Sequence, residues 1–207
     1  IVANSLSCIA NTIGRLAMDV CLYMNQNFGF LSFPSHLTTG SSIMPHKKNP
    51  DVFELIRARC NQIKSLPQQI LQITNNLPSG YHRDLQQIKE SFIPIFQQME
   101  SCLSMTSYMM QHMEVRENLL TDPKYLYLFS VERVNALVLS GTPFRDAYKQ
   151  VAKEIEDDTF SAPTQLNHTH EGSIGNLSTE KIRAAMEKNL VDFHFEDKNQ
   201  AIKELLA

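Results

Sequence analysis

Apolar residues recur every three or four positions over three long stretches of the chain, and this spacing predicts three long helices. The stretches cover residues 1 to about 27, 50 to about 76 and about 84 to 114. Short turns separate them, so neighbouring helices would lie against one another as a bundle. Their apolar stripes are longer than a monomer of this size would bury. We therefore expect an all-α fold whose long helices also pack against further copies of the chain.

A change in composition after Val115 predicts a second domain built from shorter helices. These helices are expected over residues 124–140, 143–157, 179–189 and 196–206. The predicted domains are residues 1–117, which form part of a central helical bundle, and 118–207, a small helical C-terminal domain. Because the chain begins at Ile1 within an expected helix, we expect it to be a piece of a longer protein.

Polar residues at the expected helix starts predict side-chain N-caps. Asn49 would cap the second helix, with Pro50 at the first helical position, and Asp84 would cap the third. Thr142 and either Ser178 or Thr179 would cap two of the shorter helices.

Composition narrows the class of protein. A scarcity of glycine (7 residues) favours helices, and a net charge of -3 gives no bulk positive charge for nucleic acid. The four cysteines lack the short spacing of a zinc site, so we expect buried, reduced thiols in a cytoplasmic protein. His168 and His170 lack further candidate ligands, which favours solvated or turn-forming histidines over a metal site. We expect no cofactor, no metal and no membrane-spanning segment.

Residues 40–50, Gly-Ser-Ser-Ile-Met-Pro-His-Lys-Lys-Asn-Pro, form the most unusual stretch of the chain. Hydroxyl, imidazole, ammonium and amide groups crowd together there with few apolar residues, which predicts a loop. This 40–50 loop leads into a helix N-terminus, where free backbone N–H groups favour an anion. Lys47 and Lys48 add positive charge. The loop is therefore a candidate site for a carboxylate or phosphate.

A second polar stretch runs from Tyr81 to Glu90, where the third helix is expected to start. Gln86 and Lys89 are three residues apart and would share a helix face. Periodicity alone favours a solvated first turn here.

The 40–50 loop resembles the conserved loop of the fumarase/aspartase superfamily, Gly-Ser-Ser-x-Met-Pro-x-Lys-x-Asn-Pro, at every fixed position. Within that superfamily the chain is similar to the argininosuccinate lyases. The similarity includes Phe28-Gly29-Phe30, Thr38-Thr39, Glu54-Leu55-Ile56-Arg57, the Tyr81–Glu90 stretch and Gly141-x-Pro-Phe-Arg. It extends over nearly the whole chain and is weakest after about residue 190.

The resemblance implies the fumarase/aspartase helical fold and an anti β-elimination that cleaves argininosuccinate to arginine and fumarate. It implies that Ser41 is the catalytic base, and that Lys47 and Asn49 contact a substrate carboxylate. Tyr81, Gln86 and Lys89 match positions that hold the substrate, so the Tyr81–Glu90 stretch becomes functional rather than solvated. We expect Gln86 and Lys89 to neighbour the 40–50 loop. The resemblance also implies a homotetramer whose sites combine segments of three subunits.

The chain departs from the argininosuccinate lyases in two ways. His46 stands where those enzymes usually have glutamine, and adenylosuccinate lyases often have histidine there. The family's threonine–histidine segment has no match in this chain. We therefore expect the chain to be inactive alone, with adenylosuccinate lyase or another superfamily lyase as the alternative activity. A non-catalytic structural relative is a further alternative, which the complete set of site residues disfavours.

Overall fold

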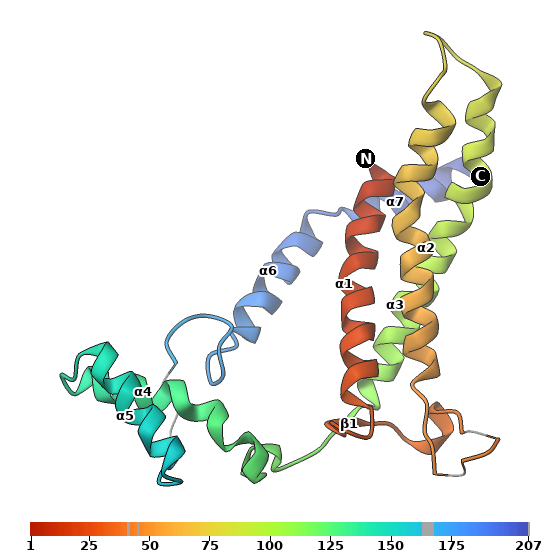
Figure 1. Cartoon of the computed structure of the whole chain (residues 1–207). Coiled ribbons are helices and arrows are strands. Elements are labelled where there is room, and N and C mark those ends of the chain that lie inside the picture. Colours follow the sequence, from red (N-terminus) through yellow and green to blue (C-terminus); the bar gives the residue numbers. More distant parts are fainter. Residues whose placement is uncertain (41, 45, 163–167, 207) are drawn as a thin grey trace. The chain divides into compact units, whose positions relative to one another are not determined.

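The computed structural model describes residues 1–40, 42–44, 46–162 and 168–206. The chain divides into two compact units, Ile1–Leu119 and Leu120–Ala207. Helices dominate both units (Figure 1), which confirms the predicted all-α fold. None of the described helices is long and apolar enough to cross a membrane.

Three long helices form the first unit: α1 (Val2–Tyr23), α2 (Asp51–Thr74) and α3 (Ile88–Gln111). They run side by side (Figure 1) around one apolar core. Both α2 and α3 continue through an internal proline, Pro67 and Pro94. The prediction of three long helices is therefore correct, although α1 and α3 end three or four residues earlier than expected.

The buried face of α1 is made largely of small residues. Its buried positions are Ala3, Leu6, Ala10, Ile13, Gly14, Ala17 and Val20. Gly14 allows the closest approach to α2, because a Cβ atom there would lie 3.3 Å from the Cβ atom of Cys60. Large apolar residues recur along this helix at Val2, Leu6, Ile9, Ile13 and Val20. Leu6, Ile13 and Val20 are buried as this pattern predicts, whereas Val2 and Ile9 are 49% and 43% exposed. The core-facing side of α1 therefore keeps part of the apolar stripe and adds small residues to it.

The predicted side-chain caps are absent where the sequence suggested them. Helix α2 begins at Asp51 with Pro50 at the N-cap position, and no side chain caps it. Asp84 lies inside a 3-10 helix, η2 (Arg83–Gln87), which precedes α3. Helix α5 has Pro143 and not Thr142 at its N-cap, and Ser178 precedes α6 without a side-chain cap bond. Helices α2, α3 and α5 therefore start later than the predicted caps would place them, whereas Ser178 occupies the predicted N-cap position of α6 but makes no cap bond.

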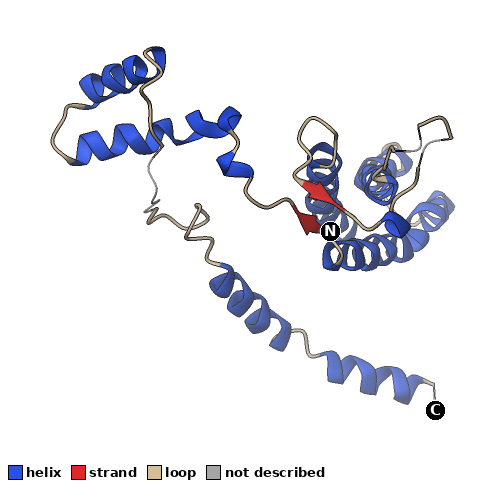
Figure 2. Cartoon of the chain, turned by 90° about the horizontal axis from the view of Figure 1, so that it is seen from below, coloured by secondary structure: helices blue, strands red, loops and turns tan. Residues whose placement is uncertain are grey.

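Two short strands, β1 (Leu31–Ser32) and β2 (Glu114–Val115), tie the segment after α1 to the segment after α3 (Figure 2). Leu31 pairs with Val115 and Ser32 with Glu114 in antiparallel register. The Ser32 hydroxyl donates a hydrogen bond to the Glu114 carboxylate at 3.0 Å. This sheet brings the end of α3 to the segment that leads into the 40–50 loop.

The four cysteines are free thiols, but they differ in exposure. Cys60 and Cys102 are buried in the core, whereas Cys8 is exposed, so the expectation of buried thiols is wrong for Cys8. Burial, together with the neighbouring Cys102 thiol, raises the pKa of Cys60 to about 11. Only the thiolate is an effective nucleophile, so the buried pair should be unreactive in the folded protein.

Iodoacetamide at pH 7 should therefore alkylate Cys8 well before Cys60 and Cys102. With a pKa near 11, on the order of one Cys60 side chain in 10⁴ is a thiolate at that pH. Mass spectrometry of tryptic peptides measures the order of labelling, and a chain unfolded in guanidinium should react at all four thiols. Cys8→Ser should remove the fast reaction alone. Equally rapid labelling of Cys60 would contradict the buried arrangement.

The second unit contains a 3-10 helix, η4 (Pro123–Phe129), followed by α4 (Ser130–Leu139) and α5 (Phe144–Glu156). Its small core consists of Val134, Ala147, Val151 and Phe160. Two further helices follow, α6 (Thr179–Val191) and α7 (Phe195–Leu205), neither of which has a buried residue. Gly141 has a φ of 102° in the turn between α4 and α5, a conformation that glycine commonly adopts just after a helix end.

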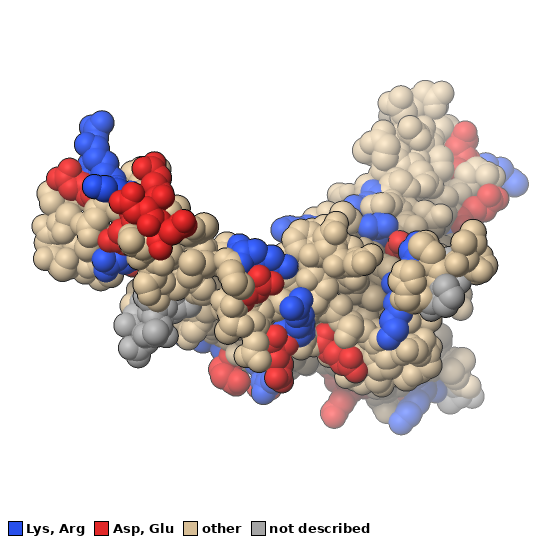
Figure 3. Space-filling model, turned by 60° about the horizontal axis from the view of Figure 1, so that its bottom comes forward, with Lys and Arg blue, Asp and Glu red and all other residues tan. Residues whose placement is uncertain are grey.

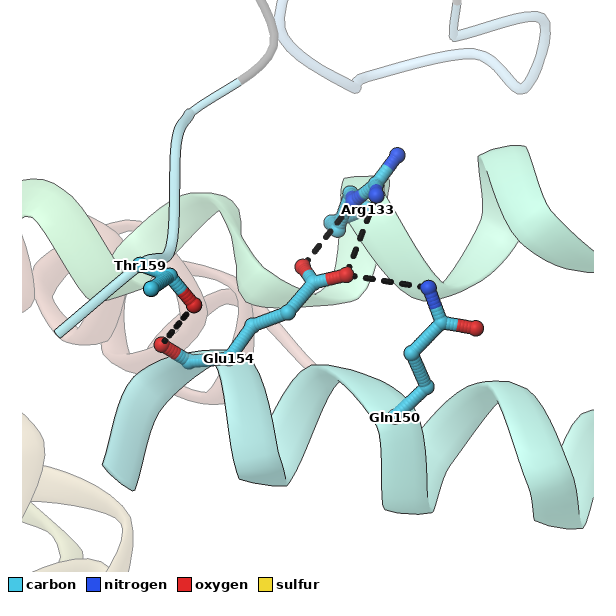
Figure 4. A network of polar contacts seen from close by, with 4 residues as sticks. All are labelled: Arg133, Gln150, Glu154 and Thr159. Atoms are coloured by element: carbon cyan, nitrogen blue, oxygen red, sulfur yellow. Dashed lines mark hydrogen bonds and ion pairs between the residues drawn. The ribbon is translucent and has the colours of Figure 1, made fainter. Parts of the chain in front are cut away.

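An ion pair joins α4 to α5 (Figure 4). The Arg133 guanidinium donates two hydrogen bonds to the Glu154 carboxylate, at 3.1 and 3.0 Å, and Gln150 donates a third at 3.0 Å. The Arg133 hydrogen bonds hold the pKa of Glu154 below its usual range. The folded protein therefore favours the ionised carboxylate more than the unfolded chain does.

Glu154→Gln should lower the stability of the α4–α5 pair by up to about 1 kcal/mol at pH 7. The pKa of Glu154 is lower in the folded protein than in the unfolded chain. The ion pair therefore contributes its full stabilisation above the unfolded pKa of 4.5, and this stabilisation is lost as the pH falls through the lower pKa of the folded protein. The difference between wild type and variant should therefore shrink in acid. Hydrogen exchange of the α4 and α5 amides measures this difference in stability. Glu156→Gln, an exposed site on the same helix, is the control, and an equal effect there would argue against the pair.

His168 is more than a solvated loop residue. Its Nε2 atom lies 2.8 Å from Oε1 of Glu132 on α4, and both side chains are about one-fifth exposed. The His168 ring also stacks on that of His170, with centroids 5.7 Å apart. The prediction that His168 is a solvated or turn-forming residue is therefore wrong, because its side chain is mostly buried and contacts Glu132. Across the described part of the chain, no group of three or more His, Cys, Asp or Glu is placed to hold a metal ion.

Candidate active site

Two buried aromatic rings support the ends of the 40–50 loop. Phe33 precedes the loop and Phe53 lies in the first turn of α2; their exposed fractions are 1% and 0%. The ring centroids are 5.6 Å apart, so the two chain segments that border the loop share one core contact. Of the aromatic residues that precede the loop, Phe33 is therefore anchored in the core, whereas Phe28 stays on the surface at 36% exposure.

Polar contacts join the loop ends just above these rings. Thr39 and Asn49 form an isolated antiparallel bridge in which the Asn49 N–H donates to the Thr39 carbonyl at 2.9 Å. The Thr39 N–H donates to Oδ2 of Asp51 at 3.1 Å, and the Thr39 hydroxyl donates to the same oxygen. The Asn49 amide donates to the Gly40 carbonyl at 3.4 Å. These hydrogen bonds join residues 39–40 to residues 49–51 and close the base of the loop at the start of α2. We call this base the neck of the loop.

Three of the loop's side chains that could carry positive charge, His46, Lys47 and Lys48, are exposed. Asn49, in contrast, is only half-exposed at the neck. Ser41 lies outside the residues that the structure describes. Figure 3 shows acidic and basic side chains interspersed over one face of the chain. The two adjacent exposed lysines of the loop, Lys47 and Lys48, suit a small anion.

The second predicted segment forms its own small arrangement. The Gln86 amide donates a hydrogen bond to the Tyr81 hydroxyl, and both residues are exposed. Gln86 belongs to η2, and Lys89 follows in the first turn of α3. The prediction that Gln86 and Lys89 share one helix is therefore wrong, because α3 begins at Ile88.

The two segments lie at opposite ends of α2 (Figure 1). The 40–50 loop precedes the first residue of α2, and the Tyr81–Lys89 segment follows its last turn. A helix of 24 residues is about 36 Å long at the usual rise per residue. The expectation that Gln86 and Lys89 neighbour the loop within one chain is therefore wrong, and no single small substrate contacts both segments of the same chain.

Comparison with known proteins identifies the class to which these segments belong. The model of a lyase family matches residues 2–64, which include α1, the 40–50 loop and the first half of α2. The argininosuccinate lyase of Bacteroides fragilis is 57% identical over 206 residues, which are 100% of this chain and 46% of that protein. The argininosuccinate lyase of Thermotoga neapolitana is 38% identical over 149 residues, 72% of this chain and 37% of that protein.

The chain belongs to the argininosuccinate lyase family. It spans about half the length of the curated relatives that it matches.

Solved structures show the same fold at lower sequence identity. An EDDS lyase in complex with formate superposes with a TM-score of 0.61 and 21% identity, over 75% of this chain and 32% of that one. A protein described as fumarate lyase:delta crystallin, from Brucella melitensis, superposes with a TM-score of 0.61 and 18% identity, over 75% of this chain and 35% of that one. These likenesses establish the helical fold of this family member.

Sequence reasoning missed the contact between Thr39 and Asp51. From the sequence, Asp51 is only an acidic residue at the start of a helix, where its charge would oppose a bound anion. The two residues are twelve positions apart, and their contact depends on how the whole loop closes. No short motif or helical period contains that information, so only the structure of this lyase family member reveals it.

Proposed function

We propose that this chain supplies part of an argininosuccinate lyase (EC 4.3.2.1), a carbon–nitrogen lyase of arginine biosynthesis. The observation that carries the proposal is 57% identity over the whole chain to a protein of that name. The complete loop pattern at residues 40–50 supports the same chemistry. The two compact units would correspond to the end of the central bundle domain and to a small C-terminal domain, in a cytoplasmic enzyme.

The proposed reaction is an anti β-elimination. Ser41 removes a proton from the carbon next to a substrate carboxylate, which leaves an aci-carboxylate dianion. That intermediate then re-forms the carboxylate and a carbon–carbon double bond as the carbon–nitrogen bond breaks. The bond electrons go to nitrogen, and the departing guanidine takes up a proton to become the guanidinium of arginine, which leaves fumarate as the other product. Lys47 and Asn49 bind the carboxylate, and their charge and N–H groups stabilise the added negative charge. Ser41 must act as an alkoxide, so the site must lower the pKa of its hydroxyl. Each pKa unit corresponds to about 1.4 kcal/mol of stabilisation of the alkoxide relative to the hydroxyl.

Tyr81, Gln86 and Lys89 hold the substrate from a different copy of the chain. The separation of about 36 Å along α2 supports this arrangement, since one chain cannot bring both segments to one substrate. Large apolar side chains that remain exposed on the first unit support assembly into a homotetramer; they include Leu55, Leu71, Ile93, Phe96, Leu103 and Tyr108. The chain alone lacks the remaining segments of the site and should be inactive.

Fumarate release from argininosuccinate by the full-length protein, followed by its ultraviolet absorbance, tests this proposal. A parallel assay with adenylosuccinate addresses the alternative that His46 raises. Turnover of argininosuccinate alone is the expected result. Turnover of adenylosuccinate alone would reassign the substrate, and turnover of neither would favour a non-catalytic structural relative.

A further inference from the structure

The two ends of the 40–50 loop are joined by a contact between one side chain on α2 and one residue of the preceding segment. We propose that Thr39 and Asp51 form a latch that fixes the neck of this loop, which makes them positioning residues for the elimination. The catalytic part of this inference rests on the proposed function. The structural part, that the latch holds the neck, does not.

The latch joins Asp51, whose backbone is held by the core, to Thr39, whose backbone is less constrained. Asp51 is the first residue of α2, and Phe53, two residues later, is completely buried, so the backbone that carries the carboxylate is held by the core. Thr39 is exposed and follows a short 3-10 helix, η1 (Ser35–Leu37). Its N–H and hydroxyl both donate to Oδ2 of Asp51. Hydrogen bonds to a charged acceptor are stronger than neutral ones, so this contact can fix the exposed end.

The latch also accounts for an acidic residue beside a site for an anion. A free carboxylate at the start of α2 would repel a substrate carboxylate at the neighbouring Lys47 and Asn49. Two donors from Thr39 satisfy the Asp51 oxygen and offset part of its charge. A carboxylate that served only to complement the dipole of α2 would need no such donors.

The residues that the latch fixes directly adjoin the proposed chemistry. Ser41 follows Thr39 by two positions, and Asn49 precedes Asp51 by two. Thr39 takes part in both contacts, since its carbonyl accepts the bridge hydrogen bond from Asn49 and its N–H donates to Asp51 in the latch. A displacement of about 1 Å in an active site can cost roughly 10²-fold in rate, so a neck that opens should reduce turnover without unfolding the protein.

Thr39→Val tests the latch because it removes the hydroxyl but keeps the side-chain shape and the charge of Asp51. Thr39→Ser keeps the hydroxyl, and Asp51→Asn removes the charged acceptor. Thr38→Val is the matched control, since the Thr38 hydroxyl bonds locally to the Ser35 carbonyl at 3.3 Å. The first readout is hydrogen exchange of the Asn49 amide, which bonds across the neck. The second is the rate of fumarate release by the full-length protein, and the third is the thermal midpoint.

Thr39→Val and Asp51→Asn should each accelerate exchange at Asn49 by about tenfold and lower kcat by a similar factor, with the thermal midpoint unchanged. Thr39→Ser should restore both, and Thr38→Val should match the wild type. Unchanged exchange at Asn49 would overturn the latch. Faster exchange with normal turnover, or a fall in turnover that follows a lower thermal midpoint, would overturn the positioning role. A wild type without turnover would remove the proposed function, while the exchange result would still decide whether the latch holds the neck.

Discussion

Replacing Ser41 by alanine should lower the kcat of the full-length enzyme by about 10²- to 10⁴-fold, the usual contribution of a general base. Alanine has no group that can take the proton from the carbon next to the carboxylate, so the dianionic intermediate would not form at a useful rate. Lys47 and Asn49 would remain to bind the substrate carboxylate. Argininosuccinate should therefore still bind to the variant with an affinity close to that of the wild type, as measured by calorimetry.

Ser42→Ala is the matched control for this prediction, because it removes the neighbouring hydroxyl from the same exposed loop. The resemblance assigns the base to the first serine of the pair, so this variant should keep its rate within a few-fold. A Ser41→Ala enzyme with an unchanged rate would refute the base role. A loss of rate in Ser42→Ala alone would move that role to the second serine.

The fold could be predicted in outline because long helices leave a strong periodic pattern in a sequence. The details that failed depend on neighbours that a pattern does not identify. On α1 the periodic pattern of large residues includes Val2 and Ile9, which are exposed, and it does not include Ala10, Gly14 and Ala17, which are buried. The β1–β2 pairing joins two-residue strands that are about eighty positions apart, so it leaves no local signal.

For the candidate site, the sequence proposes a list of residues but not how the chain arranges them. The 40–50 loop could be identified from its own residues, since its polar composition and its family pattern are both local. The position of Gln86 and Lys89 at the far end of α2 follows from the straight path of that helix. The separation of the two segments along one chain is consistent with the site shared among subunits that the resemblance implies.

Phe53→Ala should lower the free energy of unfolding of the first unit by about 3–5 kcal/mol. The Phe53 side chain is completely buried, so its loss removes apolar contacts and leaves a cavity beside Phe33. Urea unfolding of the 207-residue chain, followed by helical circular dichroism, measures the change. Because Phe53 supports the start of α2, the same variant should also accelerate hydrogen exchange at the Asn49 amide.

Phe96→Ala provides the control for this prediction, since Phe96 lies on α3 of the same unit but is 47% exposed. Truncation there leaves little new cavity, and the cost should be about 1 kcal/mol or less. Phe53→Leu fills most of the same space and should recover much of the lost stability. If Phe53→Ala cost no more than Phe96→Ala, the contact with Phe33 would not be what anchors the loop ends. The neck would then depend on its polar contacts alone, and Thr39→Val should loosen it as much as the loss of the ring does.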